Sequence, residues 1–278
     1  MDLLQKILEC NEEEIDSIIE QHIKESNDSA EKVDKLGFLT NKTANSVFKG
    51  FIPLNTRIKY ANLNMEDYGM ESTDFIYEFA HFVRAHKIIN KTALIYSLEY
   101  FVNSYFGISG KVDRETIFND IAWQTTTTDE EYFEALKNNK LGDLKGTGAA
   151  ECTERGALVQ QILSLFGTET YYCMGRVDLG EKQEAHCFNI VKRKNDYALL
   201  DYSIPVASYN LDGKVKAYYP FIGTLTNEEF FDFVNNGTIK SFDNYYMNGK
   251  EQEKTGTERM YVVGKYEIEK ENKNGKSM

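Results

Sequence analysis

The sequence predicts an α+β fold, because helical patterns fill the first part of the chain and strand patterns fill most of the rest. Before residue 107, apolar residues recur at three- and four-residue steps, as in TDFIYEFAHFVRAHKII (73–89). From residue 169 the pattern changes to segments rich in tyrosine and β-branched residues that partly alternate, such as TETYYCMGRVD (168–178). Helices followed by a run of hairpin-linked strands are typical of this fold class.

Start and stop signals place the helices. Asn11 followed by Glu14 matches a capping box, and an apolar stripe continues to about Lys24. The two strongest helical patterns each begin with a threonine, which we expect to be the N-cap, and Gly107 is expected to end the second. The helices predicted after residue 70 cover residues 73–89, 92–107, 114–123, 129–139 and, with Thr226 as N-cap, 227–237.

The strands are predicted at residues 168–178, 185–194, 196–203, 214–222 and 258–269. The chain contains no internal repeat and no glycine-rich phosphate loop. A boundary near residue 110 would divide it into a helical N-terminal region (1–110) and a second domain (111–270).

The bulk composition excludes several classes of protein. The 278 residues are 41% hydrophobic and 13% aromatic, which is enough for a full core. A formal net charge of −12 argues against a nucleic-acid partner. No stretch of about 20 apolar residues predicts a membrane span, and the acidic, amphipathic start is unlike a signal peptide. The four dispersed cysteines do not form a disulfide framework, so we expect a cytoplasmic protein with reduced thiols.

Cys152 stands at the start of the amphipathic helix in AECTERGALVQQILSLFG (150–167). The unpaired N–H groups and the positive end of the helix dipole favour a thiolate at this position. The same N–H groups could hold the oxyanion that forms when a thiolate attacks a carbonyl. We therefore expect Cys152 to be an accessible, activated nucleophile.

A thiolate that attacks a carbonyl needs a base, and the base needs an acceptor that orients it. His186 and Asp201 lie on consecutive predicted strands. A two-residue turn at 195–196 would pair Lys194 with Tyr197 and put the two residues on one face of the hairpin, four positions apart. A turn one residue earlier would make them diagonal neighbours, about 7–8 Å apart. An even register would put them on opposite faces.

The other cysteines are predicted to be packing residues. Cys187 follows His186 directly and should point to the opposite face, into the helix-packed core. Cys173 lies in mid-strand among large apolar neighbours. No C-x-x-C or H-x-x-x-H spacing occurs, so no metal site is expected, and attack by a thiolate needs no organic cofactor.

Residues 125–225 resemble the transglutaminase-like superfamily of papain-type thiol enzymes. The shared features follow one another along the chain. Cys152 opens a helix with a small residue, Ala157, five positions on, and Gly167 stands at the helix exit. Gly175 lies in the next strand, His186, Asn189 and Val191 lie in the histidine strand, and Asp201 is followed by a proline turn at Pro205.

The resemblance implies that the second domain is catalytic and has a papain-like core, in which the cysteine-bearing helix packs on an antiparallel sheet. Cys152 resembles the nucleophile, His186 the base and acid, and Asp201 the carboxylate that orients the imidazole. Trp123 and Gln124 are candidates for the family's oxyanion donor, which no motif fixes here. The sequence DYSIP departs from the family, whose aspartate is usually followed by a small residue and proline.

The implied activity is acyl transfer from a peptide or protein amide through a thioester. Hydrolysis, by a protease or deamidase, is the first expectation, and transamidation is the second. Two alternatives remain open: a catalytically silent protein-binding module of the same fold, and an arylamine N-acetyltransferase-like enzyme. The latter family also has C-x-E at its nucleophile, as in Cys152 and Glu154, but it has about half as many residues before the cysteine.

Overall fold

The computed structural model describes residues 2–30, 35–37, 47–54, 56–59, 68–69, 71–106, 145, 150, 152–178, 183–209, 215–239, 246–247, 250–251 and 260–263. The helices are α1 (Leu3–Glu9), the 3₁₀ turn η1 (Glu12–Glu14), α2 (Ile15–Ser29), α3 (Thr73–Ala85), α4 (Lys91–Phe106), α7 (Cys152–Leu165) and α8 (Asn227–Asn236). The strands are β1 (Lys35–Gly37), β2 (Val47–Lys49), β3 (Arg57–Lys59), β4 (Tyr68–Gly69), β5 (Thr170–Asp178), β6 (Gln183–Lys192), β7 (Tyr197–Tyr209), β8 (Val215–Leu225), β9 (Thr238–Ile239), β10 (Tyr246–Met247), β11 (Lys250–Glu251) and β12 (Met260–Val263).

A seven-stranded sheet forms the centre of the part of the chain that the structure describes. Its order is β8-β7-β6-β5-β12-β9, with β2 also paired to β5, and every pairing in it is antiparallel. Strands β5 to β8 follow one another as neighbours, as expected for hairpin-linked strands. The predicted α+β class is confirmed.

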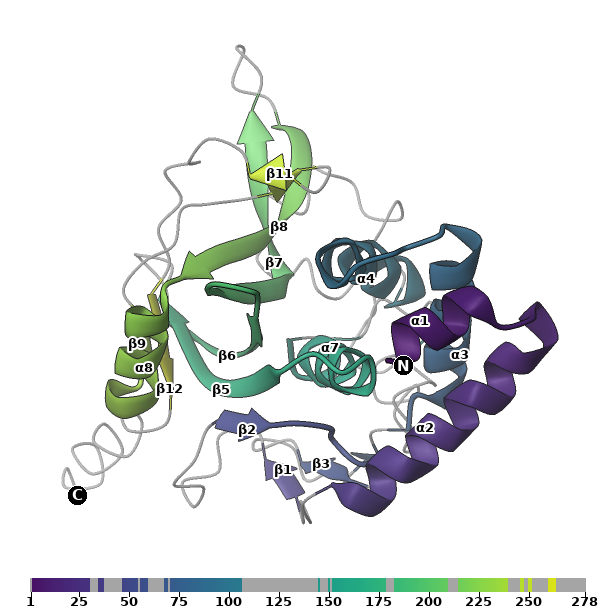
Figure 1. The fold of residues 1–278 in the computed structure, drawn as a ribbon. Helices are drawn as coiled ribbons and strands as arrows, with labels where there is room; N and C mark the ends of the chain where they lie inside the picture. The colour runs from purple at the N-terminus through teal and green to yellow at the C-terminus, as the bar shows by residue number, and fades with distance from the viewer. Residues whose placement is uncertain are drawn as a thin grey trace.

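Helix α7 lies between this sheet and the N-terminal helices (Figure 1). The larger buried cluster joins α1–α4 and α7 to one set of strand side chains, including Cys187 on β6. A second cluster contains Cys173, Phe188 and α8 residues such as Phe230. Alternate residues along these strands therefore pack into different buried clusters, because successive side chains of a strand point to opposite faces of the sheet.

Close packing fixes α7 against the sheet. A Cβ atom at Gly156 would lie 2.9 Å from the ring of Tyr172 on β5, so the absence of a side chain permits this approach. The Asn189 side chain on β6 donates to the Gly156 carbonyl oxygen at 3.0 Å and to Oε1 of Gln160 at 3.2 Å. These buried hydrogen bonds fix the position of the helix relative to β6.

Several local predictions need correction. Ser72, and not a threonine, occupies the N-cap of α3, and the Asn90 side chain caps α4 by accepting from the amide of Ala93. The region predicted to be helical also contains short strands, and one of them, β2, joins the central sheet. The predicted helices 114–123 and 129–139 lie outside the described residues.

Candidate active site

Cys152 is the first residue of α7, as the sequence predicted, but its side chain is not accessible. Only 5% of the residue is exposed, and it packs with the larger core cluster. Cys173 and Cys187 are also buried. The expectation of an accessible thiol is therefore wrong for this structure, because the whole first turn of α7, from Cys152 to Arg155, is buried.

The hairpin between β6 and β7 sets the position of His186 and Asp201. Lys192 pairs with Tyr197, and the Arg193 amide donates to the Asp196 carbonyl oxygen, so the two-residue turn lies at positions 194–195. This is the earlier of the two turns considered above. It makes His186 and Asp201 diagonal neighbours.

His186 and Asp201 form a buried pair. Nε2 of His186 lies 2.9 Å from Oδ2 of Asp201, and the two residues are 2% and 1% exposed. Because Nε2 is engaged with the carboxylate, Nδ1 is the ring nitrogen that remains for Cys152. The structure thus brings together the two sheet residues that the sequence singled out.

Two further side chains hold the Asp201 carboxylate. The Ser203 hydroxyl donates to Oδ1 at 2.9 Å, and the Tyr261 hydroxyl on β12 donates to Oδ2 at 2.8 Å. Both donors are buried. Hydrogen bonds from neutral donors stabilise an ionised carboxylate in an apolar surrounding and fix its orientation.

The Cys152 thiol lies close enough to His186 and to Cys187 for both to shift its pKa. The Cys187 contact and burial raise the pKa of the Cys152 thiol well above its ordinary value, and His186 opposes them. Cys187 is held beside the start of α7, where its sulfur lies 3.7 Å from the Thr153 hydroxyl. The expectation of a lowered pKa at the helix N-terminus is therefore wrong for this closed arrangement, because the Cys187 contact and burial outweigh the opposing effect of His186.

Burial and neighbouring groups have opposite effects on the pKa of the His186 imidazole. Burial acts to lower the pKa of His186, but the Asp201 carboxylate and the contact with Cys152 outweigh it and raise the pKa to about 10. At neutral pH the ring is therefore an imidazolium that donates through both nitrogens. The site holds a proton donor beside a thiol.

Sequence reasoning missed three members of this cluster. Ser203 could have been found, because it lies two positions after Asp201 and so shares its strand face. Cys187 was recognised as a core residue but not as a neighbour of the Cys152 thiol. No sequence pattern pointed to Tyr261, since it lies 60 positions from Asp201 along the chain. The oxyanion candidates Trp123 and Gln124 lie outside the described residues.

Comparison of the chain with models of protein families, with curated proteins and with solved structures gave no match. Within the described part of the chain, no helix is both long and apolar enough to cross a membrane.

Proposed function

We propose that the chain is a cysteine-dependent enzyme that transfers the acyl group of a peptide or protein amide, with a core like that of the transglutaminase-like superfamily. The observation that carries the proposal is the buried His186–Asp201 pair close to Cys152, whose thiol pKa His186 acts to lower. A nucleophile at a helix N-terminus, a base and an oriented carboxylate are the parts that thiol acyl transfer requires.

In the proposed reaction, substrate binding allows the Cys152 thiol to release its proton to solvent, and the resulting thiolate, beside the His186 imidazolium, attacks the amide carbonyl carbon while the first-turn N–H groups of α7 stabilise the oxyanion. The His186 imidazolium then protonates the leaving amine, which departs as the thioester forms. Water attacks the thioester carbonyl carbon while His186 removes a proton from that water, and the C–S bond breaks, which releases the carboxylic acid and restores the Cys152 thiolate and the His186 imidazolium. Attack by a primary amine in place of water would give transamidation.

Burial of Cys152 favours one rival, a catalytically silent binding module that keeps the fold. A thiol with 5% exposure and a raised pKa is a poor nucleophile as it stands. The enzyme hypothesis therefore requires that substrate binding uncovers Cys152 and separates it from Cys187. The silent module requires neither change.

Intact-protein mass spectrometry after incubation with a glutamine-containing peptide library tests the proposal. We expect an acyl adduct that maps to Cys152, is absent in Cys152→Ala, and persists in the matched control Cys10→Ala. Ammonia release without amine incorporation identifies deamidation, peptide cleavage identifies a protease, and incorporation of a fluorescent primary amine identifies transamidation. Wild-type protein that forms no adduct with peptides or with small amide-derived electrophiles would favour the silent module.

A further inference from the structure

A basic cavity lies at the opposite end of α7 from Cys152. Its volume is about 390 Å³, and it lies where the start of α4, the exit of α7 and the end of β6 meet. A helix of 14 residues spans roughly 20 Å, so the cavity and the candidate active site are separate. The volume falls within the usual range for small-molecule sites. The lining residues are Lys91, Thr92, Ile95, Gly167, Thr168, Glu169, Lys192, Arg193 and Lys194.

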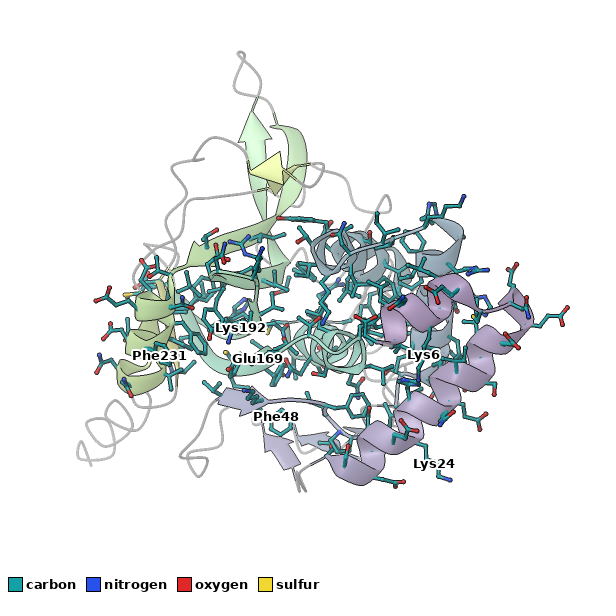
Figure 2. All side chains as sticks on the ribbon, viewed as in Figure 1. Lys6, Lys24, Phe48, Glu169, Lys192 and Phe231 are labelled. Atoms are coloured by element: carbon teal, nitrogen blue, oxygen red, sulfur yellow. The ribbon has the colours of Figure 1, made fainter. Side chains whose placement is uncertain are left out.

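The charge of this cavity is opposite in sign to that of the chain. Four cations and one carboxylate line it, whereas the whole chain carries a formal net charge of −12. Two of these charges are compensated in the structure: Arg193 forms a bidentate pair with Asp196 at 2.7 Å, and Lys49 lies 3.4 Å from Glu169. Figure 2 labels Lys192, the last residue of β6, and Glu169, which directly precedes β5.

Three lysines remain to act on a ligand. Among the described residues, no carboxylate lies within ion-pair distance of Lys91, Lys192 or Lys194. Lys91 donates to the Gly167 carbonyl oxygen at 2.6 Å, so part of its role is to stabilise the end of α7. Lys192 helps to lower the pKa of the Glu169 carboxyl and lies 6.0 Å from the centroid of the Tyr197 ring, but the one cavity-lining carboxylate does not balance the four cations that line this cavity.

Backbone amide groups add donors to the same wall. The first turn of α4 contributes Lys91 and Thr92, whose amides precede the first intrahelical bond, from Leu94 to Asn90. Thr168 lines the cavity as well, but its hydroxyl oxygen is buried away from the cavity surface and offers no donor to a ligand there.

We propose that this cavity binds the phosphate group of a small phosphate ester. Several ammonium groups around a helix N-terminus suit a multivalent oxyanion better than a single carboxylate, because each lysine acts as a point charge and the first-turn amides donate to oxygen. The cavity is larger than a phosphate ion, and Ile95 provides an apolar wall for the organic part. This site is independent of the acyl-transfer function proposed above.

Calorimetric titration of the full chain tests the proposal with three probes at constant ionic strength: inorganic phosphate, glucose 6-phosphate and sodium chloride. We expect saturable binding of glucose 6-phosphate with a Kd below about 1 mM, weaker binding of phosphate, and none of chloride. Equal affinity for phosphate and the ester would show that the free ion is the ligand. Absence of saturable binding by both would overturn the proposal.

Variants locate the binding. We expect Lys192→Gln combined with Lys194→Gln to weaken binding of the ester by about tenfold or more, since two charge-assisted contacts are lost. Lys24→Gln on α2 is the matched control, because Lys24 is an exposed lysine far from the cavity (Figure 2), and it should bind as the wild type does. Wild-type affinity in the double lysine variant would place the ligand elsewhere.

Discussion

The Tyr261 hydroxyl donates a 2.8 Å hydrogen bond to Oδ2 of Asp201, the same oxygen that faces Nε2 of His186. One carboxylate oxygen thus accepts from an imidazole on β6 and a phenol on β12. The remaining oxygen accepts from Ser203. The carboxylate is held from three directions, and its position depends on strands that are far apart in the sequence.

Replacing Tyr261 by phenylalanine should therefore remove one hydrogen bond from the Asp201 carboxylate without creating a cavity in the core. The ring would still pack against Phe188, with which it makes an aromatic contact at 4.7 Å between centroids. We expect the free energy of unfolding to fall by about 1–2 kcal/mol, since one buried hydrogen bond is lost. If the proposed reaction occurs, kcat should fall while KM changes little. Urea denaturation and adduct-formation kinetics on the same preparation check both effects.

The Asp201→Asn variant should lower the pKa of His186. The Asp201 carboxylate is the main group that raises the pKa to about 10, and burial acts in the opposite direction. Without that charge, burial should take the pKa of the ring below its ordinary value. Titration of the His186 ring protons by NMR measures the change directly. Ser203→Ala, which removes a neutral donor and keeps the charge, should leave the histidine pKa raised.

The same pair should make stability depend on pH. Because the pKa of His186 is raised from 6.5 to about 10 by folding, its stabilising contribution is complete below about pH 6.5 and is lost as the pH rises through 10. We expect the difference in unfolding free energy between the wild type and Asp201→Asn to be largest near pH 6 and to shrink towards pH 10. A difference that stays constant across this range, measured by urea denaturation, would contradict a charged His186.

Removing the neighbouring thiol should lower the pKa of Cys152. Contact with Cys187 is the largest cause of the raised value, so Cys187→Ala removes that effect and keeps the opposing effect of His186. The midpoint of the pH profile for alkylation of Cys152, followed by peptide mass spectrometry, should move to lower pH. Cys173→Ala is the matched control, because Cys173 belongs to the other buried cluster. An identical midpoint in Cys187→Ala and the wild type would remove Cys187 from the site.

Local sequence patterns were sufficient to predict the elements that carry the site. The start of α7 at Cys152, the β6–β7 hairpin and the shared face of His186 and Asp201 follow from helix signals and strand alternation alone. The exact register did not follow, because Lys194, Asn195 and Asp196 all suit a tight turn. Only the hydrogen bonds of the folded hairpin select the turn at 194–195.

The state of the thiol could not be predicted from local pattern. The helix-start position of Cys152 favours ionisation, whereas burial and the Cys187 sulfur oppose it, and both opposing effects depend on how α7 packs on β6. Tyr261 was missed for the same reason, since it reaches Asp201 only through the pairing of β12 with β5. Such contacts depend on packing between residues that are far apart in the sequence, and a short stretch of sequence carries no information about that packing.

The outer edge of β5 is shared by two segments from distant parts of the chain: β2 pairs with Tyr171–Cys173, and β12 pairs with Gly175–Asp178. A ribosome synthesises β12 after every other strand of this sheet. A nascent chain that has reached only α8 would hold Cys152, His186 and Asp201, but not the tyrosine that secures the carboxylate. Closure of such long loops is slow. We therefore expect the candidate site to be the last part of the protein to mature, only after synthesis has passed residue 263.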